Sequence, residues 1–217
     1  LISFNKNNIL IDTSPDLRSQ LLSQKITTID EVLYTHCHAD QTHGINDLRV
    51  FFLKAQKKIN VYCDKLTANY LTKNFSYCFI KKYDYPPILK MKPLKKNFML
   101  GNTDKKINIK AIKVKHGLID SIAYVVNNKI AYISDANDFY KKDYIHFKKL
   151  EYLIIDCLRF NKHISHFNLD DVLKITKLLE PKKTILTNLH TDLDYNQLLK
   201  ILPNNIKPGY DGLTVNI

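Results

Sequence analysis

The sequence predicts an α/β fold, because short β-branched or apolar runs alternate along the chain with helical patterns. Ile9–Asp12, Val32–Tyr34 and Tyr152–Asp156 have the composition of buried strands. Lys65–Asn74 and Leu169–Leu179 place apolar residues at the spacing of a helix. This alternation is typical of chains that build sheets covered by helices.

Length and composition favour one globular domain over residues 1–217. Hydrophobic residues make up 45% and charged residues 25% of the chain, which is ordinary for a globular protein. No apolar run approaches the ~18–20 residues that span a bilayer, and the first residues do not form a secretory signal. We therefore expect no membrane partner and a cytoplasmic location. The four cysteines lie far apart without a CxxC pair, which favours free thiols.

The formal net charge of +12 is a weaker guide to partners. Only Arg18, Arg49 and Arg159 are arginine, so nearly all of the excess is lysine. Lysines spread along helices and loops usually form a solvated face. The charge favours a small anionic substrate, but only weakly. It gives no support for nucleic-acid binding, which stays an open alternative, as does a homodimer.

Several local expectations follow from turn and cap residues. Ser14-Pro15-Asp16 should open a helix, with Ser14 as N-cap. The buried face of that helix should be formed by Leu17, Leu21 and Leu22, and that of a helix over 45–55 by Ile45, Leu48, Phe52 and Ala55. Asn127-Asn128 should be the two-residue turn of a hairpin. Residues 81–106, rich in proline and lysine, suggest a long surface segment.

The most informative stretch runs from Thr35 to Asp40, with His36 and His38 one strand period apart. This spacing puts both imidazoles on one side, and Asp40 continues past the end of the strand. Imidazole suits zinc, manganese or iron, and a carboxylate adds a hard ligand for a second ion. The pattern therefore predicts a metal site.

Three further candidates follow other predicted strands. His116 comes after 107–115, Asp135 after 131–134, and His190 after 184–186. Ligand sites gather at the carboxyl ends of strands in α/β sheets. Together with His36, His38 and Asp40, these residues make up the ligands of a two-metal site.

On these residues the chain resembles the metallo-β-lactamase superfamily, whose signature H-x-H-x-D-H is followed by separate His, Asp and His ligands. Within it, the chain is most similar to a cyclic-phosphodiesterase branch associated with phosphonate breakdown. Leu10–Thr13, Thr42–Ile45 and Tyr210–Gly212 add to the likeness, which covers essentially the whole chain. The resemblance implies a four-layer αββα sandwich and one or two ions, Zn²⁺ or Mn²⁺.

The resemblance also implies a role for each candidate. His36, His38 and His116 would hold one ion, Asp135 would bridge, and Asp40 with His190 would hold the second. Asp12 would brace the signature loop from behind. Asp40 and His166 are the expected catalytic residues, His166 contacting the scissile group without binding metal, with His163 as its reserve.

The chain departs from the family pattern at two places. Gln41 stands where the signature has its last histidine, and an amide oxygen is a weaker metal ligand than imidazole. The second site is therefore expected to be weakened, and His43 is expected to pack or hydrogen-bond nearby. Relatives also carry a few dozen further residues at the beginning, including first strands that we expect this chain to lack. A sheet edge near Ile9–Asp12 should then have no neighbour.

Three functions remain after these observations. The first is hydrolysis of a phosphodiester or cyclic phosphate, including that of a nucleotide, by metal-activated water. The second is hydrolysis of a thioester, lactone or lactam on the same metal site. The third, of another class, is a degraded relative that binds metal or nucleotide without turnover.

Overall fold

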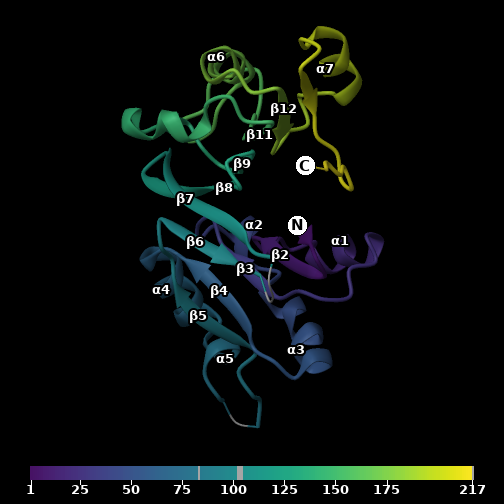
Figure 1. Cartoon of the computed structure of the whole chain (residues 1–217), viewed down its shortest axis with the longest axis vertical. Coiled ribbons are helices and arrows are strands. Elements are labelled where there is room, and N and C mark those ends of the chain that lie inside the picture. The colour runs from purple at the N-terminus through teal and green to yellow at the C-terminus, as the bar shows by residue number, and fades with distance from the viewer. Residues whose placement is uncertain (83, 102–104, 217) are drawn as a thin grey trace. The chain divides into compact units, whose positions relative to one another are not determined.

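Two mixed β-sheets, each covered by helices, make up the architecture (Figure 1). The computed structural model describes residues 1–82, 84–101 and 105–216. The chain divides into two compact units. The first unit is Leu1–Leu94 with Gly101–Lys105, and the second unit is Lys95–Leu100 with Lys106–Ile217.

The first unit contains a five-stranded sheet in the order β1-β2-β3-β4-β5. Its strands are β1 (Ile2–Phe4), β2 (Asn7–Ile11), β3 (Glu31–Leu33), β4 (Ile59–Cys63) and β5 (Leu89–Pro93). Strands β2 to β5 are parallel, and β1 pairs antiparallel with β2. The β1–β2 turn places Asn5 and Lys6 in the left-handed region, with φ of 45° and 63°.

The expected unpaired edge at Ile9–Asp12 is wrong. Strand β2 pairs with β1 on one side, where Ile2 lies opposite Ile9, and with β3 on the other. Ile9 and Leu10 are consequently buried. A three-residue strand with a two-residue turn supplies the neighbour, because a short hairpin needs little sequence to form.

The helices of the first unit pack on its sheet. They are α1 (Leu17–Ser23), α2 (Ala39–Thr42), η1 (Ile45–Leu48), α3 (Arg49–Ala55), α4 (Lys65–Asn74) and α5 (Ser76–Phe79). Their apolar faces form one core with the strands, built around Leu10, Val32, Tyr34, Ile45, Val61 and Leu71.

Two expectations about these helices need correction. Helix α1 begins at Leu17 rather than at Pro15, because Ser14 and the following residues form a turn in which Leu17 N–H donates to the Ser14 carbonyl. Leu22 is exposed while Leu17 and Leu21 are buried. In the helix pair over 45–55, Phe51 rather than Ala55 reaches the core, because the first turn is a 3₁₀-helix and rotates the later residues.

The second unit contains an eight-stranded sheet in the order β10-β7-β8-β9-β11-β12-β13, with β6 also paired to β7. Its strands are β6 (Asn97–Leu100), β7 (Ile107–His116), β8 (Ile119–Val126), β9 (Ile130–Ile133), β10 (Asp138–Phe139), β11 (Tyr152–Asp156), β12 (Lys183–Thr187) and β13 (Ile206–Pro208). Strands β7, β8 and β9 form an antiparallel meander, and β9, β11, β12 and β13 are parallel.

The predicted hairpin is confirmed, but three residues rather than two connect its strands, because Val126 pairs with Ile130 and Lys129 lies outside β9. Asn127 and Asn128 have φ of 50° and 56°, the conformation that asparagine tolerates best after glycine. The predicted irregular segment over 81–106 is wrong in part, since it contains β5 and β6. Residues 83 and 102–104 of that segment lie outside the described part.

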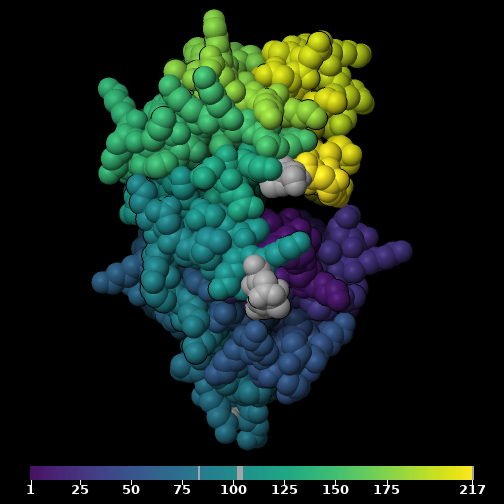
Figure 2. Space-filling view, viewed as in Figure 1, coloured from purple at the N-terminus to yellow at the C-terminus, as the bar shows by residue number. Residues whose placement is uncertain are grey.

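Helix α6 (Leu169–Leu179) and the 3₁₀-helix η2 (Lys141–Phe147) pack on the second sheet. Helix α7 (Tyr195–Ile201) contributes Leu198 to the same core. Asn168 caps α6 by accepting from Asp171 N–H at 2.9 Å. Figure 2 shows the C-terminal residues, in yellow, beside the green part of this unit. In the described residues, no helix has the length and apolar character that a membrane crossing requires.

Each unit thus supplies one layer of sheet and one layer of helix, and the predicted α/β class is confirmed. The carboxyl ends of β3, β7, β9, β11 and β12 carry the residues that the sequence singled out.

Candidate active site

In the first unit, the loop after β3 carries His36 and His38. The Thr35 hydroxyl donates its one proton to Asp12 Oδ2 at 2.9 Å. The same hydroxyl oxygen lies 3.0 Å from His36 Nδ1, so it accepts from that nitrogen. His36 is therefore protonated on Nδ1, and its Nε2 presents a lone pair.

That lone pair faces His38. His36 Nε2 lies 2.9 Å from His38 Nδ1, and the two ring centroids are 4.5 Å apart at an interplanar angle of 73°. Two nitrogens that each lie about 2 Å from one ion are themselves roughly 3 Å apart. The pair therefore has the chemistry and spacing of two neighbouring ligands of one divalent ion.

Asp12 holds this loop from behind. Its Oδ1 accepts from Thr35 N–H at 2.7 Å, in addition to the hydroxyl at Oδ2, and the side chain is buried. Asp12 follows β2 directly and adopts a φ of 60°, a left-handed conformation that aspartate tolerates. This left-handed conformation turns the chain at Asp12 so that its carboxylate points at Thr35 of the loop.

The start of α2 is tied to the segment after β2. Thr13 N–H donates to the Gln41 carbonyl at 2.8 Å, and Gly44 N–H donates to the Thr13 carbonyl at 2.9 Å. Gly44 is required by this close approach, because a Cβ there would lie 2.0 Å from the Ser14 carbonyl oxygen. The loop with the two histidines is thus clamped at both ends.

Asp40, Gln41 and His43 lie around this loop. Asp40 is exposed, and its Oδ2 accepts from Gln41 Nε2 at 2.9 Å. Gln41 therefore turns its amide nitrogen, which is no metal ligand, toward the carboxylate. His43 hydrogen-bonds the Tyr70 hydroxyl at 3.1 Å and packs edge-on against Phe75. Cys37 lies half-buried between the histidines, and burial raises the pKa of its thiol.

In the second unit, His116 ends β7 and is buried. Its Nδ1 lies 2.7 Å from the Ser165 carbonyl oxygen, which can only accept, so Nδ1 carries the proton. The lone pair of His116 is then on Nε2, and this atom lies 3.8 Å from Asp135 Oδ2. Asp135 follows β9 and is also buried. The two side chains present an imidazole nitrogen and a carboxylate oxygen toward the same space.

His166 completes this group. Its Nδ1 lies 2.7 Å from Asp156 Oδ2, its Nε2 lies 3.9 Å from Asp135 Oδ2, and its ring lies edge-on to His116 with centroids 4.8 Å apart. The Asp156 carboxylate thus orients the ring so that Nε2 faces the His116–Asp135 pair. An imidazole held in this way is suited to donate or accept a proton at Nε2.

Asp156 is a further candidate for the site, and the sequence alone indicates only that it ends a buried strand. It is fully buried at the end of β11 and accepts from Ala136 N–H at 3.0 Å and from Asn188 Nδ2 at 3.2 Å, besides His166. Burial raises the pKa of the Asp156 carboxyl, against the opposing effect of these hydrogen bonds. The signal in the sequence was an aspartate that closes an otherwise apolar strand ten residues before His166.

The remaining candidates are less closely involved. His163 packs on His166 with ring centroids 5.1 Å apart and hydrogen-bonds Ser165, and burial lowers the pKa of its imidazole. His190 is exposed, and its Nδ1 lies 3.1 Å from Asp192 Oδ1. The predicted partners of a second ion, Asp40 and His190, are thus both exposed and engaged with their chain neighbours.

The described residues that could hold a metal ion include His36 and His38 of the first unit and His116 and Asp135 of the second. Three imidazoles and one carboxylate are a ligand set for a divalent transition metal. The orientation of His36 and His116 by hydrogen bonds at the nitrogen opposite the lone pair is the arrangement usual for metal-binding histidines.

Comparison with known proteins agrees with this chemistry. Residues 7–188 match the family described as "Beta-lactamase superfamily domain". A diphosphatase from the PhnP family has a structure with a TM-score of 0.87 and 27% identity, covering 97% of this chain and 80% of that one. Zn²⁺-bound PqqB from Methylobacterium extorquens, at 12% identity, has a TM-score of 0.79 and covers 100% of this chain and 86% of that one.

One curated relative is an octanoyltransferase of Porphyromonas gingivalis, which is 30% identical over 209 residues, or 94% of this chain. The present chain spans only 41% of the length of that protein. The family match covers most of the chain and carries the assignment. The chain belongs to the β-lactamase superfamily domain family, has the metallo-β-lactamase fold, and stands near the PhnP branch of its hydrolases.

Proposed function

We propose that the protein is a metal-dependent hydrolase of phosphodiesters or related phosphate esters. The observation that carries this proposal is the Asp156–His166 pair. A buried carboxylate holds His166 Nδ1 at 2.7 Å and turns Nε2 toward Asp135 and His116. Cleavage of a phosphodiester expels an alkoxide, and an imidazole placed in this way can protonate it.

The chain's own residues then divide the work. His166 delivers a proton from Nε2 to the leaving oxygen, and the Asp156 carboxylate stabilises the imidazolium that makes this transfer. Asp40 orients the attacking water, and Asp12 keeps the loop of His36 and His38 in place through Thr35. The name of the PhnP-family diphosphatase supports a substrate built on phosphate.

His36, His38, His116 and Asp135 are the proposed metal ligands, with zinc or manganese as the ion. A divalent ion bound there supplies Lewis acidity toward the phosphoryl oxygens and activates water. We propose that the ligands of the two units act on the same metal centre, and that Asp40 and His190 serve a second, weaker site. A small anionic substrate and a cytoplasmic location complete the proposal.

Metal content and turnover together test it. Purified protein should hydrolyse bis(4-nitrophenyl) phosphate, lose this activity to a chelator, and regain it with Zn²⁺ or Mn²⁺. His38→Ala and His116→Ala should each lower bound metal, and the double variant should lose no more than either single variant, because the ligands share one centre. His146→Ala is the matched control, a histidine of the second unit outside the cluster.

The outcomes separate the hypotheses. Independent, additive losses of metal would show two separate sites. Full metal content without turnover of any ester would point to a non-catalytic relative.

A second candidate is hydrolysis of a thioester or another activated acyl group on the same residues. It is favoured by one observation, the similarity to a protein named octanoyltransferase over nearly the whole of this chain. An octanoyl thioester and 4-nitrophenyl octanoate in the same assay decide between the two. A kcat/KM for either acyl substrate above that for the phosphodiester would replace the first candidate with the second.

A further inference from the structure

A pocket of about 540 Å³ opens in the second unit, beside the carboxyl half of β12 and the middle of β11. Its walls come from these strands, from the residues after β13, and from the C-terminal segment up to Val215. The volume falls within the roughly 300–1,000 Å³ of small-molecule sites. The mechanism proposed above does not use this pocket.

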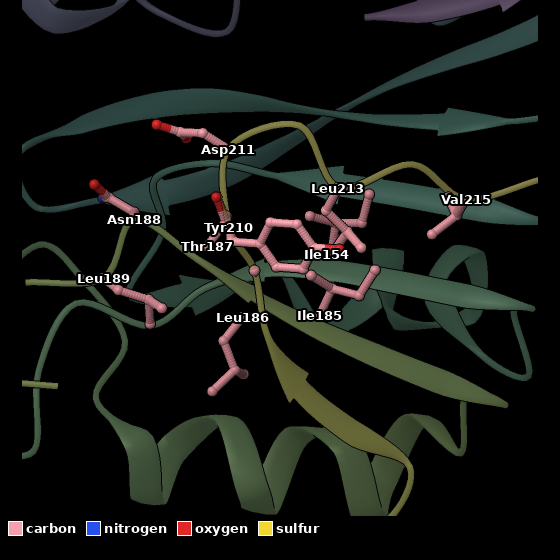
Figure 3. A pocket seen from close by; sticks show the side chains of 11 residues that line it. Ile154, Ile185, Leu186, Thr187, Asn188, Leu189, Tyr210, Asp211, Leu213 and Val215 are labelled. Atoms are coloured by element: carbon pink, nitrogen blue, oxygen red, sulfur yellow. The ribbon is translucent and has the colours of Figure 1, made fainter. Parts of the chain in front are cut away.

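The pocket has a polar end and an apolar end (Figure 3). Asn188 and Asp211 present their oxygen and nitrogen atoms at one side, while the Tyr210 ring lies beside Ile154 and Ile185. Leu213 and Val215 extend the apolar side. The Tyr210 ring is held by an edge-on contact with Tyr195, with centroids 6.1 Å apart at 82°.

Asn188 connects the pocket to the catalytic group. Its Nδ2 lies 3.2 Å from Asp156 Oδ1 and 3.4 Å from His166 Nδ1. The polar end of the pocket is therefore one side chain away from the imidazole that we propose to act on the leaving group. The pocket and the imidazole thus share Asn188 as a hydrogen-bond partner, which makes the pocket the candidate site for a group attached to a phosphate held at His166.

The charges decide which part of a substrate the pocket takes. Asp211 is exposed at its polar end, and the buried Asp156 lies behind Asn188, whereas no lysine or arginine is among the lining residues. A phosphate would be repelled there. A neutral ring that carries a hydrogen-bond donor suits both ends, since the ring packs on Tyr210 and the donor reaches a carboxylate.

We propose that this pocket binds the uncharged organic group of the substrate, an aromatic or heterocyclic ring with a hydroxyl substituent. Tyr210 and the isoleucines contact the ring, and Asp211 accepts from the hydroxyl. This inference rests on the proposed phosphodiesterase function and adds to it the class of alcohol that the phosphate carries.

Three diesters with the same 4-nitrophenolate leaving group test the inference. Their second alcohol is methanol, benzyl alcohol or 3-hydroxybenzyl alcohol. The native protein should prefer them in the order 3-hydroxybenzyl, benzyl, methyl, mainly through KM. Tyr210→Ala should lower kcat/KM for both ring diesters about three- to tenfold and leave the methyl diester within about twofold. Asp211→Ala should abolish the roughly tenfold advantage of 3-hydroxybenzyl over benzyl.

Matched controls are Tyr85→Ala and Asp170→Asn. Tyr85 is 62% exposed against 58% for Tyr210 but belongs to the first unit, and Asp170 is an exposed acid of α6. Neither variant should change the preference. Equal kcat/KM for the three diesters, or equal losses in Tyr210→Ala and Tyr85→Ala, would overturn the inference.

Calorimetry with 3-hydroxybenzyl phosphate separates this inference from the proposed function. Binding of this ligand that Tyr210→Ala weakens and Tyr85→Ala does not would support the pocket even if no diester is hydrolysed. Turnover of the diesters without such binding would leave the hydrolase proposal standing and remove the pocket from it.

Discussion

Replacing Asp156 with asparagine should slow the chemistry without dismantling the site. Asp156 Oδ2 accepts from His166 and from Ala136 N–H, and Oδ1 accepts from Asn188. An amide oxygen can take the place of Oδ2, and the Asn188 amide can rotate to accept from the new NH₂ group. The shape and the orientation of His166 are then kept, and the negative charge beside the imidazole is lost.

The size of the effect follows from that charge. A hydrogen bond to a charged group contributes about 1.5–3 kcal/mol, so losing the charge that stabilises the imidazolium should slow proton delivery roughly 10- to 200-fold. The loss should appear with an alkoxide leaving group, which needs the proton. With 4-nitrophenolate, which departs without a proton, we expect a loss of less than about threefold.

The assay compares methyl and 4-nitrophenyl leaving groups in Asp156→Asn, His166→Ala and the native protein, with metal content measured in each. Asp143→Asn is the control, because Asp143 is a buried aspartate of the same unit that lies near Lys96 and His146 instead. Equal losses on both leaving groups would mean that the pair binds substrate rather than protonating it. Native rates on both would remove Asp156 and His166 from the reaction.

Three further predictions concern the metal, the loop clamp and the thiols. The native protein should hold fewer than two equivalents of metal, and Gln41→His should raise the second; two tightly held ions that the substitution does not change would contradict this. Gly44→Ala should lower the free energy of unfolding by about 1–3 kcal/mol and Tm by roughly 2–12 °C, because the new Cβ would meet the Ser14 carbonyl oxygen. An unchanged Tm in calorimetry would show that the backbone around Ser14 moves aside at no cost in stability. Burial raises the pKa of Cys63 and Cys157 to about 12 and that of Cys78 to about 11. A thiol reagent at pH 8 should therefore label at most Cys37 in the native protein and all four cysteines in urea, and rapid labelling of a second thiol in the native protein would refute this prediction.

Local patterns predicted the elements that depend on nearby residues. Helix α4, helix α6 and strand β11 have the bounds that their periodicity indicates, and the Asn127-Asn128 turn follows from backbone preference alone. The expected absence of disulfides is confirmed, since all four cysteines are free.

Features that depend on distant partners could not be predicted in this way. Strand β5 is rich in lysine and ends at Pro93, and it is a strand because β4 pairs with it along its whole length. Strand β6 exists through β7 in the same manner. Leu22 has the right character for a core residue, and only the position of α1 on its sheet decides that it faces outward.

The candidate site shows the same division. The places of His36, His38, His116 and Asp135 at strand ends predicted them as ligands, and in the structure hydrogen bonds orient His36 and His116. Their shared coordination of one centre, the role of His190 and the single-domain organisation stay predictions. Asp156 was missed because one aspartate at the end of a strand looks like any other until its partner, His166, folds beside it.

His36 and His116 differ in which substitutions would remove the hydrogen bond that orients each ring. The proton of His36 is placed by the Thr35 side chain, so most codon changes at position 35 would release that ring. The proton of His116 is placed by the main-chain carbonyl of Ser165, which every amino acid possesses. A saturation library should therefore retain His116 function across many residues at position 165, while position 35 should accept little beyond serine. One of these two histidines is oriented by a side chain, and the other is oriented by the path of the backbone.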